Sequence, residues 1–386
     1  MCSSDLNERT DGEPVNSRDI ITATTAAAFR LPSAPSHDEL RQTARWISSL
    51  QLDNGMIPWF VGGHCDPWNH VETAMALDVM ELHREASRAY DWLQSVQRRD
   101  GSWHNYYRSD GSVEDAKLDS NVCAYVAAGV WHHWQCTQQL GDIERWWPMV
   151  ERAMEFVLNM RRKDGTVLWA KEVDAEPWDY ALLTGCSSIR HSLHCAANVA
   201  ALVGEPRPLW RAAADAIDAV INHSPDSFEP KTRWAMDWYY PVLAGALSMS
   251  AAEERLRDGW ERHVMEGYGV RCVSTNDWVT AAETAECVIA LDAVGWTEQA
   301  LELLTLTRRH RRDDGSYWTG IAYPESVTFP DRETTSYTGA AIILAADALL
   351  NWSPAAGLFR HGLLPAVIDL AEPGCPLGLP GECTPR

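Results

Sequence analysis

Hydrophobic positions along the chain fall into two alternating kinds of segment. Segments of the first kind carry charge on one face, as amphipathic helices do, and lie near 38–50, 84–98, 143–161, 207–223, 251–265 and 297–311. Segments of the second kind are apolar nearly all round, and each follows residues that favour a helix start: Asp66-Pro67, Ser120, 184–188, Asp237, Thr280 and 334–338. A helix that is apolar on every side is packed on every side. The alternation therefore predicts six hairpins, each pairing an amphipathic outer helix with the buried inner helix that follows it.

Four of the amphipathic segments end in the same way, with an Asn-Gly or Asp-Gly turn followed by an aromatic residue. They read "WISSLQLDNGMIPWF" (46–60), "WLQSVQRRDGSWHNYY" (92–107), "FVLNMRRKDGTVLWA" (156–170) and "LTLTRRHRRDDGSYWTG" (304–320). Asn-Gly and Asp-Gly tolerate positive φ and stop a helix sharply. A repeat of this kind indicates a helical array. We expect an all-α fold, an (α/α)6 toroid of six helical hairpins, with little strand outside the loops.

The predicted loops differ in length on the two sides of the ring. Connections from outer to inner helices take about 10 to 25 residues, whereas the reverse connections take only a few. Long loops on a rigid scaffold usually carry function. We therefore expect the active site on the face formed by the amino-terminal ends of the inner helices. The predicted catalytic domain spans 37–352, after a partly ordered arm (1–36) and before a Gly/Pro-rich tail (353–386).

The charge balance narrows the class of partner. Lysine and arginine number 33 against 54 acidic residues, a formal net charge of −21. Nucleic acid and anionic membrane surfaces require a basic patch, so the composition argues against both and suits a neutral substrate. The 19 Trp and 11 Tyr greatly outnumber the 6 Phe. Such rings either stack on sugars or wedge helices apart, and the composition leaves both interpretations open.

Targeting and metal signals are weak. The first residues lack the basic and apolar regions of a signal peptide, and no apolar run reaches about 18 residues, so we expect a cytoplasmic protein. The ten cysteines show no zinc-binding spacing, and Cys375 and Cys383 would pair only if oxidised. We expect no metal and no cofactor, and either a monomer or a homodimer.

The stretch "GGHCDPWNHVE" (62–72) begins the first inner segment. Asp66 before Pro67 is a strong helix-cap signal, yet a cap alone requires none of His64, His70 or Glu72. Glu283 is equally ambiguous, because Thr280 followed three residues later by Glu283 is also a capping-box pattern. From the sequence alone, Asp66 and Glu283 can each have a structural role, a catalytic role or the two together.

Cleavage of a glycosidic bond by an inverting enzyme requires two carboxyl groups about 6.5–9.5 Å apart, one protonated and one ionised. In a ring of hairpins such groups come from distant segments, and Asp66 and Glu283 fit this arrangement. The acid must be desolvated, for example by Trp59 or Trp68, and Asp179 and Asp237 are the alternatives for that role. The residues expected to bind substrate are Trp59, His64, Trp68, His70, Glu72, Asp179, Tyr180, Asp237, Trp238, Tyr239, Arg271, Trp278 and Tyr337.

Several known families share these features. The "WL..Q..DGSW" units resemble the QW repeats of terpene cyclases and prenyltransferase β subunits, but no DxDD, DDxxD or zinc set accompanies them. A sugar epimerase on the same barrel would use a histidine pair, for which His64, His70, His191 and His194 are candidates. A sugar-binding toroid without catalytic activity is a further alternative.

The span from about 38 to 350 is more similar to six-hairpin glycosidases. The stretches "GGHCDPWNHVETAMALDV", "YALLTGCSSI", "MDWYYPVL", "GVRCVS" and "DGSYWTG" resemble the mycobacterial hydrolases of methylmannose polysaccharide, a family of endo-α-1,4-mannosidases. The resemblance implies a cytosolic, metal-free, inverting enzyme that cuts inside an α-1,4-linked chain of mannose and 3-O-methylmannose. It also implies that Asp66 and Glu283 are the catalytic pair.

Overall fold

The computed structural model describes residues 34–360, in which 12 α-helices dominate. Six of them are buried along most of their length: α3 (Pro67–Val79), α5 (Ser120–Thr137), α7 (Leu183–Leu202), α9 (Ala235–Leu243), α11 (Ala281–Ala293) and α13 (Ser336–Leu350). The other six are amphipathic: α2 (His37–Leu50), α4 (His83–Val96), α6 (Leu140–Asn159), α8 (Pro208–His223), α10 (Met249–His263) and α12 (Thr297–Leu306). Most of the predicted arm, much of the predicted tail, and Cys375 and Cys383 lie outside the described residues.

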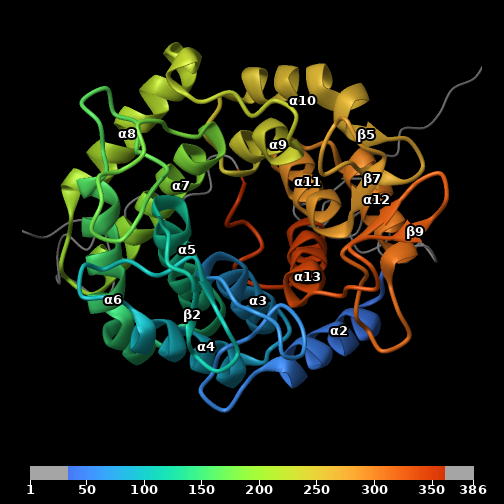
Figure 1. The fold of residues 1–386 in the computed structure, drawn as a ribbon, viewed down its shortest axis with the longest axis horizontal. Coiled ribbons are helices and arrows are strands. Elements are labelled where there is room, and N and C mark those ends of the chain that lie inside the picture. The colour runs from blue at the N-terminus through green and yellow to red at the C-terminus, as the bar shows by residue number, and fades with distance from the viewer. Residues whose placement is uncertain (1–33, 361–386) are drawn as a thin grey trace, which may run out of the picture.

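The buried helices contact one another in cyclic order. Helix α3 contacts α5, and the contacts continue through α7, α9, α11 and α13, which returns to α3. The amphipathic helices lie outside this ring (Figure 1). Among the outer helices, each inner helix from α3 to α11 packs most extensively against the one that follows it, as α3 does on α4 and α7 on α8. The last inner helix, α13, packs most on α2. The sequence pattern paired each inner helix with the preceding outer helix instead. Loops of a few residues force consecutive helices together, which explains the difference.

The repeated turns account for contacts between neighbouring outer helices. Gly55, after α2, has φ +96°, and a Cβ there would collide with the carbonyl oxygen of Arg88 on α4. Gly101, after α4, has φ +88° and meets Arg152 on α6 in the same way. Only glycine permits both the positive φ and the close approach. The turn that stops each of these helices therefore also docks it on the next outer helix.

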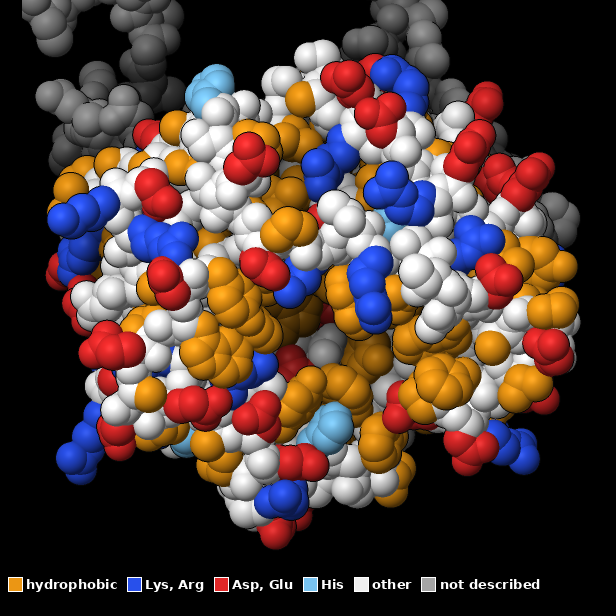
Figure 2. Space-filling view, turned by 45° about the horizontal axis from the view of Figure 1, so that its top comes forward, with side chains coloured by type: hydrophobic (Ala, Val, Ile, Leu, Met, Phe, Trp, Pro, Cys, Tyr) orange, Lys and Arg blue, Asp and Glu red, His pale blue; other side chains and the backbone are white. Residues whose placement is uncertain are grey.

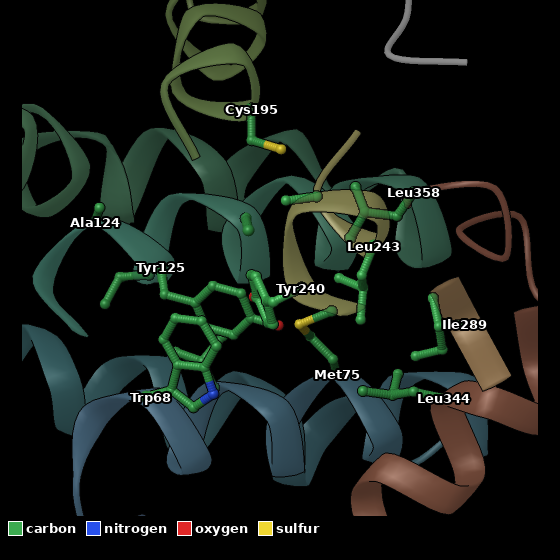
Figure 3. Packing of buried hydrophobic residues seen from close by; sticks show 14 of the residues in the cluster. Trp68, Met75, Ala124, Tyr125, Cys195, Tyr240, Leu243, Ile289, Leu344 and Leu358 are labelled. Carbon is green, nitrogen blue, oxygen red and sulfur yellow. The ribbon is translucent and has the colours of Figure 1, made fainter. Parts of the chain in front are cut away.

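The centre of the ring is filled by side chains from all six inner helices. Trp68 on α3 stacks on Tyr125 of α5 with ring centroids 3.9 Å apart, and Tyr240 of α9 lies beside them (Figure 3). Deeper in the ring, Ile289 and Leu344 pack into the same cluster. Burial of so much apolar surface is the main stabilising contribution to the ring.

The chain after α13 closes the end of the ring away from the long loops. His191 Nε2 donates to the carbonyl oxygen of Leu358 at 3.0 Å, and its ring stacks on Phe359. Arg360 Nε donates to Asp292 Oδ2 at 2.8 Å, near the last turn of α11. Leu358 and Phe359 therefore form a floor beneath the centre of the ring.

The long loops contain short antiparallel strands. These are β1 (Tyr106–Tyr107) with β2 (Val113–Asp115), β3 (Leu118–Asp119) with β4 (Ala170–Lys171), β5 (Val264–Met265) with β6 (Gly269–Val270), and β7 (Trp278–Thr280) with β8 (Gly320–Ala322) and β9 (Val327–Thr328). Two 3₁₀ turns, η1 (Pro225–Ser227) and η2 (Thr307–His310), complete the loops. Pairs such as β3–β4 and β7–β8 tie together the loops of neighbouring hairpins. The predicted helix-rich fold is confirmed, and no described helix combines the length and apolar character of a membrane span.

Candidate active site

A hollow opens in the middle of the molecule, with hydrophobic side chains around it and acidic side chains within and beside it (Figure 2). The loops before α3, α5, α7, α9, α11 and α13 are all long, and they gather at the amino-terminal ends of these helices. We call this set of loops the rim. Its side chains determine what the hollow can do chemically.

Asp66 is the N-cap of α3, as its position before Pro67 predicts. Its Oδ1 accepts from the backbone N–H of Asn69 at 3.0 Å. Its Oδ2 accepts from Trp59 Nε1 at 2.7 Å and from Asn69 Nδ2 at 2.8 Å. Burial raises the pKa of Asp66 above its ordinary value and outweighs these donors, which lower it. The cap is therefore also a carboxyl group whose protonated form is favoured by burial.

Glu283 occupies the third position of α11, after the N-cap Thr280, and is half-buried. The capping box that the sequence suggested does not form, because the Thr280 side chain accepts no capping hydrogen bond. The helix amino terminus nevertheless favours a negative charge at this position. The structural role predicted for Glu283 is therefore absent.

Tyr337 connects the two acids. Its ring lies 4.9 Å from that of Trp59, which donates to Asp66. Burial raises the pKa of the Tyr337 hydroxyl, and the negative charges of Glu283 and Asp66 raise it further. Electrostatic effects of this size act over short distances. Asp66 and Glu283 therefore both lie close enough to Tyr337 for their charges to act on its hydroxyl.

A second pair of acids lies deeper. Glu72 stands six residues after Asp66, and Glu286 stands six residues after Thr280, so the two occupy equivalent positions on α3 and α11. They are 5 % and 8 % exposed. Glu72 Oε1 accepts from Trp68 Nε1 at 3.0 Å, so the Trp68 indole donates to Glu72 and not to Asp66.

Both deep carboxyl groups favour their protonated forms. Burial raises the pKa of Glu72, and the charge of Glu286 raises it further. Burial also raises the pKa of Glu286 to about 8, although the Tyr239 hydroxyl donates to its Oε2. Two like charges this deeply buried cannot both persist. Glu286 therefore carries its proton at neutral pH, and burial favours the protonated form of Glu72.

Aromatic rings line the rim on the side of α3. The ring of Trp59 lies 4.4 Å from that of His64, which in turn lies 4.7 Å from that of Tyr106. His64 Nδ1 also approaches Glu114 Oε2 at 3.3 Å. Tyr106 was not predicted from the sequence. It follows Asp100-Gly101, the second of the repeated turns, which was the only local signal for it.

Further around the rim, the loop before α7 presents another aromatic group. The ring of Trp169 lies 5.5 Å from that of Tyr180 and 5.0 Å from that of Trp178. Asp179, an alternative candidate for the acid, has a side chain that is 96 % exposed and paired with Arg162. Its carboxyl group lacks the desolvation that an acid at neutral pH requires.

The loops before α11 and α13 hold the remaining rim candidates. Arg271 Nε donates to Asp277 Oδ1 at 3.1 Å, and its Nη1 donates to the Val264 carbonyl oxygen at 3.1 Å. Trp278, in β7, donates from Nε1 to the Phe329 carbonyl oxygen at 3.0 Å. These contacts fix Arg271 and Trp278 in the loops bordering α11.

The sequence comparison identifies the family. A curated relative from Mycolicibacterium hassiacum, MMP endo-(1,4)-3-O-methyl-alpha-D-mannosidase, is 46 % identical over 352 residues, covering 91 % of this chain and 94 % of the relative. The chain belongs to this mannosidase family. The predicted resemblance is thereby confirmed, and the chain is a member of a family of glycoside hydrolases. No protein-family model matches it.

Solved structures agree on the fold of this glycosidase. A glycosidase in complex with glucose is 15 % identical, covers 88 % of this chain and 100 % of its own, and has a TM-score of 0.67. A D-mannose isomerase, 12 % identical with coverages of 81 % and 96 %, has a TM-score of 0.62. These identities establish only a shared fold, which hosts more than one chemistry.

Three residues of the glycosidase that were predicted to bind sugar lie away from the aromatic rings beside Asp66. His70 is 1 % exposed, and its two ring nitrogens contact the backbone of Ile57 and Ala89. Trp238 stacks on His263, and its Nε1 donates to the Arg255 carbonyl oxygen at 2.8 Å, so it packs against α10. Asp237 lies on the same side, with Oδ2 4.0 Å from Arg255 Nη2.

The orientation of α9 explains this. Successive residues of a helix point about 100° apart. Tyr239 points inward, where its hydroxyl donates to Glu286, and is fully buried. Asp237 and Trp238 consequently face the outer helix. Asp237, as an alternative acid, is therefore not directed at the space between Asp66 and Glu283.

The histidines of the epimerase interpretation do not form a pair at the rim. His191 contacts Leu358 near the floor. His194 lies with Asp215 and Asp218 in a cluster whose ligand-type atoms are within 4.8 Å of one another. Arg190 Nε already approaches Asp218 Oδ1 at 2.6 Å. The Arg190 guanidinium therefore already supplies a positive charge to this cluster, and we assign no metal to it.

Proposed function

We propose that this protein is an endo-α-1,4-mannosidase that cleaves methylmannose polysaccharide with inversion, using Asp66 and Glu283. The observation that carries the proposal is the 46 % identity of this chain to a curated MMP endo-(1,4)-3-O-methyl-alpha-D-mannosidase. The influence of both acids on Tyr337, beside Trp59, supports the choice of Asp66 and Glu283. The scaffold we propose is an (α/α)6 toroid that forms one catalytic domain over 37–352. Cyclic contact among the inner helices supports it.

Asp66 is the proposed general acid. Burial raises its pKa above the ordinary value, which favours the protonated form that a general acid requires. It donates its proton to the glycosidic oxygen as the bond to the anomeric carbon breaks. Trp59 and Asn69 hold the carboxyl group in place through the hydrogen bonds described above.

Glu283 is the proposed general base. It is more exposed than Asp66, so water can reach it, and it lies in the first turn of α11, where the helix dipole favours the carboxylate. It takes a proton from the water that attacks the anomeric carbon from the opposite face. The product then has the inverted anomeric configuration. Glu286, which lies deeper, keeps its proton at neutral pH.

The rim suits a neutral, methylated sugar chain. Trp59, His64 and Tyr106 offer ring faces beside Asp66, and such faces accommodate methyl ethers and sugar C–H groups. The net charge of −21 does not repel a neutral polymer. Cytoplasmic location, the lack of a cofactor, and a monomeric or homodimeric state remain predictions.

The test uses purified methylmannose polysaccharide and the variants Asp66→Asn and Glu283→Gln. Each should lower kcat at least about a hundredfold, in line with acid–base contributions, with an unchanged circular dichroism spectrum. Glu144→Gln, on the exposed face of α6, is the matched control and should retain full turnover. Full activity in either of the first two variants would refute the assignment.

Two further measurements separate the roles, and a third tests the stereochemistry. Asp66→Asn should recover activity on an aryl α-mannoside whose leaving group requires no protonation, whereas Glu283→Gln should not. Azide should rescue Glu283→Gln, because a small anion replaces the activated water. NMR of the first product should show the inverted anomer, and retention would exclude the proposed mechanism.

A further inference from the structure

A groove of about 510 Å³ lies on the rim between the loop before α7 and the loop before α9. Its lining includes Tyr180, Leu183, Phe228, Pro230 and Asp237. The two loops are joined beneath it, because the Glu229 N–H donates to the Ala181 carbonyl oxygen at 2.9 Å. Its volume is within the range of about 300 to 1,000 Å³ typical of ligand sites. We call it the Tyr180 groove.

A series of side-chain contacts connects the Tyr180 groove to Asp66. Trp59 donates to Asp66, and its ring lies 5.7 Å from that of Tyr106. Tyr106 and Trp169 both lie close to Asp119. Burial raises the pKa of Tyr106, and the negative charges of Asp66 and Asp119 raise it further. Trp169 Nε1 donates to Asp119. Trp169 in turn contacts Tyr180, with ring centroids 5.5 Å apart. A row of aromatic side chains therefore leads from the acid to the groove.

The chemistry of the groove suits a neutral sugar chain. Tyr180 contributes a flat ring to the lining, and the ring of Trp178 lies nearly parallel to it, at 18° with centroids 6.4 Å apart. Phe228 and Pro230 add apolar surface, as methyl ethers require. The charged groups occur in pairs of opposite sign, such as Arg162 with Asp179. Such pairs provide hydrogen bonds to hydroxyl groups without selecting an anion.

The closed floor decides where a long substrate can go. An endo-acting enzyme must let both arms of the chain leave the cleavage point. Leu358 and Phe359 obstruct the far end of the ring, so the chain cannot thread through it. Both arms must leave across the rim, and the Tyr180 groove is an open path that begins at the aromatic row.

We propose that the Tyr180 groove binds one arm of the polysaccharide, a neutral segment of O-methylated hexoses beyond the residue being cleaved. This inference rests on the proposed function and adds a binding site to it. Sugar rings stack on Tyr180 and Trp178, and the polar pairs contact their free hydroxyls. The groove thereby makes affinity depend on chain length.

The experiment measures kcat and KM for α-1,4-linked 3-O-methylmannose oligomers from disaccharide to decasaccharide, with the intact protein and Tyr180→Ala. The variant should raise KM for the long oligomers about tenfold, the loss expected for one stacking contact. It should leave kcat and the KM of the shortest cleaved oligomer unchanged. Tyr180→Phe keeps the ring and should behave as the intact protein does.

Leu209→Ala is the matched control, because Leu209 is 77 % exposed at the start of α8, at the opposite end of that hairpin from the rim. It should change neither constant. If the intact protein shows length-dependent KM that Tyr180→Ala leaves unaltered, the groove proposal is refuted and the proposed function stands. If the intact protein cleaves no oligomer, the proposed function itself fails, and the groove loses its substrate.

Discussion

Replacing Glu286 by glutamine tests whether the deep acids carry protons in the folded protein. Glu286 is 8 % exposed, and burial holds its pKa at about 8, against an ordinary value of 4.5. The Tyr239 hydroxyl donates to its carboxyl group. Glutamine keeps the shape and an acceptor oxygen for this bond but has no proton to lose. The variant therefore isolates the cost of ionisation.

The direction in which stability changes with pH follows from proton binding. Between pH 4.5 and 8 the folded protein retains a proton that the unfolded chain has released, so the free energy of unfolding falls as pH rises. At pH 7, about 2.5 units above the ordinary pKa of 4.5, retaining this proton lowers the free energy of unfolding by about 3 kcal/mol. Glu286→Gln removes this penalty. Its stability advantage over the intact protein should grow by about 2 to 3 kcal/mol between pH 5 and pH 7.

Urea unfolding followed by tryptophan fluorescence at pH 5, 6 and 7 measures this difference. Glu144→Gln, on the exposed face of α6, is the control and should give a curve parallel to that of the intact protein. If the curve of Glu286→Gln is also parallel, the folded protein carries no extra proton at Glu286. The description of the deep acids as a protonated pair would then be wrong.

Three further predictions concern single contacts. Asp66→Ala should lower the free energy of unfolding by about 1 kcal/mol more than Asp66→Asn, because asparagine still caps α3; equal melting temperatures would contradict this. Trp59→Phe removes a donor at 2.7 Å that lowers the pKa of Asp66, so the alkaline limb of kcat/KM should move to higher pH, and an unmoved limb would remove Asp66 from the acid role. Burial opposes ionisation of Asp78, but hydrogen bonds from His133 at 2.8 Å and His83 at 2.9 Å outweigh it and hold its pKa below the ordinary value. Its stabilising contribution, present at neutral pH, should be lost in acid as the pH falls through that pKa. Asp78→Asn should cost about 3 to 5 kcal/mol at pH 7, and a much smaller loss in urea unfolding would show that the network is dispensable.

The sequence by itself determined the helical order and the positions of the two proposed catalytic acids along it. Alternating amphipathic and apolar segments, stopped by Asn-Gly and Asp-Gly turns, are local signals, and so is Asp66 before Pro67. Short reverse connections also placed the long loops on one face. Each of these features depends on residues close together in the chain, where propensity and capping act directly.

Only the tertiary structure decided which way the inner helices face. A helix that is apolar on all sides has no amphipathic direction, so periodicity cannot tell which side chains point to the centre. Packing turned Tyr239 inward and Asp237 outward, and it buried His70. The pairing of Glu72 with Glu286 and the course of the Tyr180 groove depend on cyclic contacts between distant segments. No local pattern encodes such contacts, because they are set by the combined packing of the whole ring.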